Sequence, residues 1–403
     1  MHPTYVRTAM TYVTLTVIMW KIITLVALGA GTIIAPINHA FTLFRDSHYP
    51  DFGFTLPYWM TAWGNFDAFY YLGIAKRGYF VSELPFFPLY PFFIALLTQL
   101  IKPLPYLASG LIIAHVAFFA GLVVSAKLLA VDGKRVLLPL FLVALVLFPT
   151  SYSYGAAYND SVFFLFATLT IYWSRTDRWW LAGLFGALAT LTRFNGLALF
   201  PYLIIELATS STKATLATWK FNALFQSLTT HILNGRRDPR IHSILLIPAA
   251  FAGYLFYIQN VFGSWTKLFA AMNTWGQDRI ILPIQVFWRY GKIMLFTPLT
   301  QLVWWVALME LISVLFYSAL LVWSFRKIRM SYWIFFAFSI LIPSLTGTFQ
   351  GMPRYGLHLY PLFLVLAMVL HKRSLIGKFI YVLVMLALLL FCVILFTRGY
   401  FIA

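Results

Sequence analysis

The chain has 403 residues, of which 62% are hydrophobic and 10% are charged. Soluble proteins are roughly 45 to 50% apolar and about 25% charged, so a soluble globular enzyme is excluded. The net charge of +18 does not indicate a nucleic-acid-binding face, because the basic residues are scattered between apolar segments. The single cysteine, Cys392, excludes a disulfide framework and a zinc or iron–sulfur cluster within one chain.

Apolar runs predict the membrane segments, since a spanning helix needs about 20 mainly apolar residues. We expect about eleven spans, at residues 12–35, 106–130, 136–152, 161–174, 179–192, 197–208, 244–262, 302–325, 332–349, 357–370 and 379–397. The first is too long for the core of a signal peptide and predicts a retained anchor. Lys21 lies in its first half and can extend toward the cytoplasmic surface. The sequence predicts an all-α polytopic membrane protein with one domain, residues 1–403.

The positions of Lys and Arg predict the orientation, because short cytoplasmic loops retain positive charge. With the N-terminus inside, every inside loop is basic, and the largest, residues 209–242, can contact anionic headgroups. This orientation requires that residues 85–101 do not cross the membrane. Pro85, Pro88 and Pro91 weaken a spanning helix there. Residues 36–105 then form a long first loop on the outside, and such a length indicates a functional loop.

The acidic residues are few enough to be weighed one by one. A carboxylate within an apolar span is unfavourable and indicates function, and this applies to Glu206 and Glu310. Glu206 lies near a cytoplasmic end, and we interpret it as structural. Asp132, Asp177 and Asp238 lie in basic inside loops, where we interpret them as charge balance.

The segment WGNFDAFYYLGIAKRGY, residues 63–79, is a dense polar and aromatic constellation. At helical pitch Asp67, Tyr70 and Tyr71 share one face. A carboxylate partly shielded by aromatic rings can act as a general base. The alternative is an interfacial amphipathic helix in which Asp67 is a solvated charge.

Further polar segments lie at predicted outer ends of spans. In SYSYGAAYNDSVFF, Asn159 and Asp160 can hydrogen-bond a sugar or cap the following helix. The other segments are LTRFNGLALFP with Arg193 and Asn195, FGSWTKLFAAMNTWGQDR with Trp275, Gln277, Asp278 and Arg279, and GMPRYGLHLYP with Arg354, Tyr355 and His358. Isolated arginines are usually interface anchors. Several on one membrane face, with carboxylates beside them, indicate a site for an anionic lipid headgroup.

Taken in chain order, these motifs resemble a known series. WGNFDAFYYLGIAKRGY with FFPLYP, then AAYNDSVFF, ALATLTRFNGLAL, FGSWTKLFAAMNTWGQDR and MPRYGLHLYP are similar to the motifs of the phosphatidylinositol-glycan class V (PIG-V-like) mannosyltransferases. That family belongs to the GT-C superfamily of membrane glycosyltransferases. The resemblance runs over residues 63–361. Phe66 stands where the family usually has Trp, and YNDS, residues 158–161, stands where it has a Glu-bearing YxES-like motif.

The resemblance implies a GT-C-like fold and an inverting transferase. It would move a sugar, typically mannose, from a polyprenyl- or dolichyl-phosphate donor to an acceptor hydroxyl on the non-cytoplasmic face. Asp67 matches the carboxylate of the first motif and would be the base that deprotonates the acceptor. Inversion by single displacement needs one base, whereas a glycosidase needs a paired acid and base.

The resemblance also implies roles for the remaining candidates. A phosphate leaving group needs cations rather than a general acid. Arg193, Arg279 and Arg354 are the candidates for that role, with Lys76 and Arg77 in reserve. Asp160 would orient a sugar or acceptor hydroxyl, and Trp275 would stack on a sugar face. The other expected substrate-binding residues are Asn159, Asn195, Gln277 and Asp278.

Two readings from other classes stay open. A transporter or flippase of anionic lipid-linked saccharides would use the same arginines, but it favours midplane charges and broken helices in matching halves. The other reading is a non-catalytic assembly subunit.

The eight histidines show no paired spacing, so no metal or other cofactor is expected. The expected partners are the lipid-phosphate sugar donor, a lipid-linked acceptor and membrane lipids, without nucleic acid. The short loops favour a prokaryotic cell membrane with the active site facing outside.

Overall fold

The computed structural model describes residues 3–48, 56–210, 238–277 and 279–402. In these ranges the chain forms helices and connecting loops, without a strand. It divides into two compact units. The first comprises Met1–Leu165 and Leu366–Ala403, and the second comprises Phe166–Val365.

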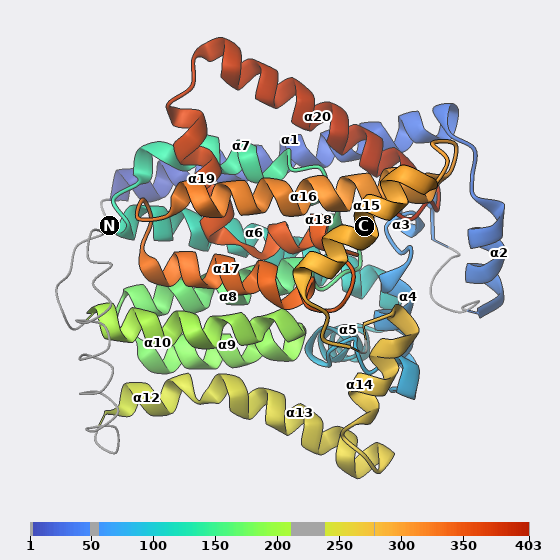
Figure 1. Ribbon diagram of the computed structural model, residues 1–403, viewed down its shortest axis with the longest axis horizontal. Coiled ribbons are helices and arrows are strands. Elements are labelled where there is room, and N and C mark those ends of the chain that lie inside the picture. The colour runs from blue at the N-terminus through green and yellow to red at the C-terminus, as the bar shows by residue number, and fades with distance from the viewer. Residues whose placement is uncertain (1–2, 49–55, 211–237, 278, 403) are drawn as a thin grey trace. The chain divides into compact units, whose positions relative to one another are not determined.

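The first unit is built around the N-terminal helix α1. Its helices are α1 Pro3–Ile34, α2 His39–His48, α3 Tyr58–Thr61, α4 Asp67–Arg77, α5 Leu89–Leu100, α6 Tyr106–Val131, α7 Leu138–Val146, the start of α8 Asp160–Arg175, and α20 Leu375–Thr397 (Figure 1). α1 packs against α6, α7 and α20. In its core the Trp20 ring lies 4.9 Å from Phe118, which stacks on Tyr154 at 4.3 Å. These rings fix the irregular segment before α8 against two long helices.

The second unit consists of paired helices. They are the remainder of α8, α9 Trp179–Thr192, α10 Leu199–Ser210, α12 Pro239–Ile244, α13 Leu246–Phe262, α14 Lys267–Met272, α15 Pro283–Phe296, α16 Leu302–Ser324, α17 Met330–Ser344, α18 Met352–Tyr355 and the start of α19 Tyr360–His371. α9 lies beside α12 and α13, and α10 packs on α17 (Figure 1). At Gly183 a Cβ would overlap the backbone of Ser243, so glycine permits the close approach of α9 to α12.

Five helices are long and apolar enough to cross a membrane by length and composition. They are Pro3–Ile34, Tyr106–Val131, Pro239–Phe262, Leu302–Ser324 and Leu375–Thr397. A sixth span results if Met352–His358 and Tyr360–His371, bent by 87°, are counted together. The chain is therefore an all-α membrane protein. Each of the other predicted segments contains a shorter helix, such as α7 at Leu138–Val146 and α17 at Met330–Ser344, so five or six helices meet the length of a span.

The described residues of the predicted first outside loop, 36–48 and 56–105, contain the helices α2 to α5. α5, at Leu89–Leu100, has 12 residues, a length of about 18 Å against the roughly 30 Å of the hydrocarbon core. Most of the predicted basic loop, residues 209–242, lies outside the described residues.

Candidate functional site

Asp67 is the first residue of α4 and is half-buried. The preceding residue, Phe66, has φ 55°, which is rare for a side chain other than glycine. Its ring is held between Phe41, at 4.5 Å, and Phe396, at 5.8 Å. Such a backbone conformation costs on the order of 1 to 3 kcal/mol and persists only when its surroundings enforce it. The aromatic packing therefore fixes the residue at which α4 begins and the direction in which the Asp67 side chain extends from the backbone.

The Asn159–Asp160 motif meets the Asp67 motif within the first unit. The Ala157 backbone N–H donates to the Trp63 carbonyl oxygen at 3.0 Å. Asn159 is 3% exposed, and Asp160, the first residue of α8, is fully buried. We call Asp67, Asn159 and Asp160 the carboxylate cluster. It joins two of the motifs that the sequence identified.

Tyr90 of α5 lies near one residue of each motif, Tyr71 and Asp160. Its ring lies edge-on to Tyr71 of α4, with 5.2 Å between the ring centres. Burial raises the pKa of the Tyr90 hydroxyl well above its ordinary value, and the neighbouring Tyr71 and Asp160 raise it further. The hydroxyl therefore stays protonated, and it donates to the Gly110 carbonyl oxygen at 3.0 Å.

Arg193 meets the Met352–His358 segment within the second unit. It follows α9 in an extended conformation. Its Nη1 lies 3.2 Å from His358 Nε2, and its guanidinium lies over the Tyr355 ring at 4.8 Å. Because a guanidinium can only donate, Nε2 accepts and the imidazole carries its proton on Nδ1. Arg354, in the same segment, is 6% exposed.

Asn195 lies two residues beyond Arg193 and is 2% exposed. Neither its Nδ2 nor its Oδ1 has a hydrogen-bond partner among the described residues. Buried amides are nearly always hydrogen-bonded, so this side chain has an unused donor and acceptor. We call Arg193, Asn195, Arg354 and His358 the arginine cluster.

The α16 helix supports the turn that carries Arg354. Tyr317 donates its hydroxyl to the Pro353 carbonyl oxygen at 3.1 Å. A Cβ at Gly356 would overlap the Tyr317 hydroxyl, so glycine permits this close packing. Seven residues earlier on α16, Glu310 is 4% exposed. Residues two turns apart lie on the same face of a helix, so both side chains point toward this segment.

Glu310 accepts hydrogen bonds from the Tyr290 hydroxyl and from the Gly351 backbone N–H. The Tyr290 oxygen in turn accepts from the Phe349 backbone N–H at 3.0 Å. Burial raises the pKa of Tyr290, with a further contribution from Glu310, so the phenol stays protonated. Glu310 thus holds the backbone immediately before Arg354. The sequence missed Tyr290 and Tyr317; only the helical spacing of Tyr317 from Glu310 pointed to the latter.

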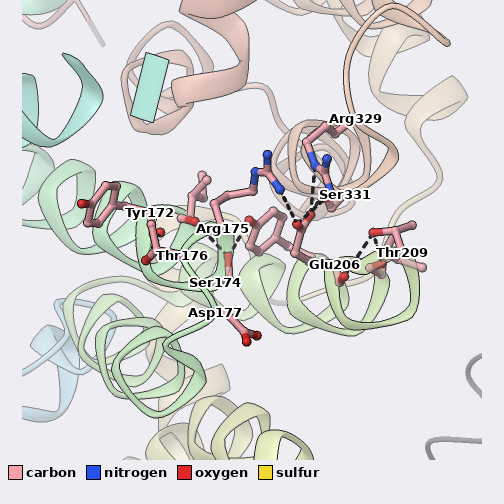
Figure 2. Close-up of polar contacts among 12 residues, drawn as sticks. Tyr172, Ser174, Arg175, Thr176, Asp177, Glu206, Thr209, Arg329 and Ser331 are labelled. Atoms are coloured by element: carbon pink, nitrogen blue, oxygen red, sulfur yellow. Dashed lines mark hydrogen bonds and ion pairs between the residues drawn. The ribbon is translucent and has the colours of Figure 1, made fainter. Parts of the chain in front are cut away.

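Glu206, the other glutamate in a predicted span, is engaged in ion pairs. Figure 2 shows its carboxylate facing Arg175 and Arg329, whose Nη atoms lie 3.3 and 2.9 Å from Oε1. The Ser331 hydroxyl donates to Oε2 at 2.5 Å. Glu206 is 1% exposed. This network joins the ends of α8 and α10 to the start of α17, as a structural interpretation requires.

The reserve cations Lys76 and Arg77 lie at the exposed end of α4. Arg77 forms a two-pronged ion pair with Glu83, at 2.8 and 2.5 Å, and covers the Phe80 ring at 4.0 Å. The charge of Arg77 is therefore balanced locally by Glu83.

The Trp275–Arg279 motif is described in part. Gln277 is half-buried, Arg279 is exposed, and Ile281 donates its N–H to the Leu345 carbonyl oxygen at 2.8 Å. That bond places the chain after Arg279 beside the turn that leads to α18. Asp278 and the side chain of Trp275 lie outside the described residues.

No protein-family model matches the chain, and no curated protein matches it. Among the residues that the structure describes, no three His, Cys, Asp or Glu side chains are grouped as metal ligands. The assignment of a function therefore depends on the two clusters and on the motif resemblance.

Proposed function

We propose that the chain is a membrane glycosyltransferase that moves a sugar, by its motif resemblance mannose, from a polyprenyl- or dolichyl-phosphate donor to an acceptor hydroxyl with inversion. Asp67 is the base that accepts the acceptor proton. Arg193 and Arg354 bind the phosphate that leaves, and Arg279 is a further candidate. Asn159, Asp160 and Asn195 hydrogen-bond the substrates.

The observation that carries this proposal is the pairing of motifs that are distant in the chain. The Asp67 motif is hydrogen-bonded to the segment before Asn159 and Asp160, through the backbone of Trp63 and Ala157. Arg193 contacts His358 in the segment that also carries Arg354, and Asn195, two residues after Arg193, is a buried amide with unused hydrogen-bonding capacity. A base and a set of cations are the two requirements of inverting transfer with a phosphate leaving group.

The finer architecture belongs to the same proposal. We propose a GT-C-like fold in which the short apolar helices complete about eleven spans, while α5 remains in the outer leaflet. The first segment after α1 then faces the non-cytoplasmic side, as the basic inside loops predict. The protein resides in a prokaryotic cell membrane under this proposal.

The role of Asp67 as the base is tested with Asp67→Asn, which keeps the side-chain shape and removes the basicity. We expect transfer of labelled mannose from a polyprenyl-phosphate donor to fall about a hundredfold to ten-thousandfold. Donor binding and folding should be retained. The matched control is Asp132→Asn at the end of α6, which should transfer at the wild-type rate. Near wild-type turnover of purified Asp67→Asn would refute the assignment.

The role of Arg193 and Arg354 in binding the leaving phosphate is tested with variants that change the charge or the hydrogen-bonding geometry. Arg354→Ala or Arg193→Ala should lower the rate about a hundredfold to a thousandfold. Lysine at either position keeps the charge but loses the bidentate geometry, so it should retain partial activity. Unchanged turnover in both folded alanine variants would show that these arginines are interface anchors.

One observation favours transport as the second candidate. The pair Met352–His358 and Tyr360–His371 is bent by 87° and carries Arg354, and transporters build midplane anion sites from such broken helices. Among the described helices, only this pair is broken in that manner. Liposomes that contain the protein distinguish the two functions. A transporter moves a fluorescent lipid-linked saccharide across the bilayer even as Asp67→Asn, whereas the transferase does not.

A further inference from the structure

We propose that Lys21, Trp63 and His115 form a binding site for a phosphate group that can carry a P–OH, either the monoester headgroup of a lipid or free inorganic phosphate. The site lies within the first unit and joins α1, the segment before α4, and α6. It does not depend on the proposed glycosyl transfer.

The position of Lys21 in α1 raises the question of what balances its charge. α1 extends over Pro3–Ile34, so at 1.5 Å per residue Lys21 lies about 27 Å from one end and about 20 Å from the other. A lysine side chain cannot reach either helix end over that distance. The extension of Lys21 toward the cytoplasmic surface stays a prediction; the structure shows its ammonium over Trp63, 4.8 Å from the ring centre.

The ammonium has no acidic partner among the side chains that the structure describes. A charged side chain deep in a membrane protein is unfavourable unless it is paired. The cation–π contact with Trp63 compensates for part of that cost. An anion at this position would supply the remainder.

The two side chains beside Lys21 have unused hydrogen-bonding atoms. Trp63 is 2% exposed, and its Nε1 has no partner among the described residues; the same holds for the buried Nε2 of His115. His115 Nδ1 lies 2.7 Å from the Leu111 carbonyl oxygen and donates to it, so Nε2 is left as an acceptor.

The segment of residues 155–157 lies beside both His115 and Trp63. His115 Nε2 lies 3.5 Å from the position of a Cβ on Gly155. Two residues further, Ala157 is hydrogen-bonded to the backbone of Trp63 at 3.0 Å. Trp20, which precedes Lys21, has its ring 6.3 Å from that of His115. Lys21, Trp63 and His115 therefore lie near one another, around α1 and the segment of residues 155–157.

The hydrogen-bonding pattern selects the ligand. The ammonium and the indole N–H are donors that suit anionic oxygens, while His115 Nε2 is an acceptor that suits a P–OH group. A phosphate monoester and inorganic phosphate both offer anionic oxygens and, when partly protonated, a P–OH group. A phosphodiester or a carboxylate offers no such hydroxyl in its ionised form.

The test measures binding to the purified full-length chain in neutral detergent by calorimetric titration. The probes are dihexanoyl phosphatidic acid, inorganic phosphate and, as a diester control without a hydroxyl, dihexanoyl phosphatidylmethanol. We expect Lys21→Met to weaken binding of the monoester at least about tenfold, as the loss of a charged hydrogen bond requires. Trp63→Phe keeps a ring under the ammonium, removes the N–H and should weaken binding severalfold.

The matched control is Lys292→Met. Lys292 also lies over a tryptophan, Trp288, at 5.6 Å, but that ring is 69% exposed. This variant should bind like the wild type. Tight binding of phosphatidic acid alone identifies a lipid headgroup, and equal binding of inorganic phosphate identifies the free anion.

Three results would overturn the proposal. The first is the absence of saturable binding of both phosphatidic acid and inorganic phosphate, and the second is equal affinity for the diester. The third is wild-type affinity in Lys21→Met. If Lys21→Met does not fold, Trp63→Phe takes its place, and an unchanged affinity in that variant overturns the proposal.

Discussion

Two buried glutamates of the second unit, Glu206 and Glu310, use their carboxylates in different ways. Glu206 is 1% exposed and is bound by the side chains of Arg175, Arg329 and Ser331 (Figure 2). Glu310 is 4% exposed and is bound by a tyrosine hydroxyl and a backbone N–H. The first carboxylate joins helices to helices. The second holds a turn that carries Arg354.

The difference shows that burial of a carboxylate does not by itself indicate a functional site. A buried ion pair is weak support for function, since its removal leaves uncompensated charge and mainly costs stability. Hydrogen bonds to loop backbone instead fix the geometry of the neighbouring residues in the chain. Glu206 should therefore affect folding, and Glu310 should affect activity more than folding.

The largest expected effect is that of Glu206→Ala on stability. Removal of the carboxylate leaves Arg175 and Arg329, each 18% exposed, without their shared partner, and breaking a buried pair costs about 3 to 5 kcal/mol. Unfolding in detergent micelles measures the loss. The control is Arg240→Met, whose pair with Asp238 has side chains 32% and 13% exposed and should cost no more than about 1 kcal/mol. Equal losses of unfolding free energy in the two variants would contradict the expectation that the buried Glu206 network contributes more stability than the exposed Arg240–Asp238 pair.

Glu310→Gln should separate activity from stability. The amide keeps the shape but disturbs the bonds to Tyr290 and Gly351, at a cost of about 1 to 3 kcal/mol in unfolding free energy. A displacement of Arg354 by about 1 Å can cost up to a hundredfold in transfer rate. Kinetic assays should show that loss in Glu310→Gln and not in folded Glu206→Gln. A larger loss of transfer rate in Glu206→Gln than in Glu310→Gln would assign the positioning of Arg354 to Glu206.

Gly356→Ala should disturb the second contact between α16 and this segment. The new methyl group would overlap the Tyr317 hydroxyl, and overpacking costs about 1 to 3 kcal/mol. In a Tyr317→Phe background the overlap is reduced, so the alanine should cost less there. A double-mutant cycle of unfolding free energies measures the coupling, and additive effects would show that the two residues are independent.

Thr348→Val should have the smallest effect. The Thr348 hydroxyl lies 3.2 Å from the Tyr290 hydroxyl in a half-buried position, and such a neutral hydrogen bond contributes about 0.5 to 1.5 kcal/mol. The loss should appear in thermal unfolding without a change in turnover. A loss as large as that of Glu310→Gln would mean that Tyr290 is positioned by Thr348 rather than by Glu310.

Much of the fold is dictated by local properties of the sequence. The apolar composition and the periodic runs predicted an all-α membrane protein, because in a bilayer only helices and closed barrels satisfy the backbone hydrogen bonds. The spacing of Asp67, Tyr70 and Tyr71 predicted the helix that became α4. The segments of the candidate site were identified in the same way, by polar residues that interrupt apolar runs. The proposed roles of these residues stay predictions.

The sequence by itself therefore determined the class of protein and which residues to test. Only the tertiary structure decided which of them touch. It brought Arg193 to His358, 165 residues away in the chain, and bound Glu206 to side chains of two other helices. It also placed the ammonium of Lys21 over Trp63. The physical reason is that a helical period shows which face of a segment is apolar, while the neighbour of a polar side chain depends on how distant helices pack.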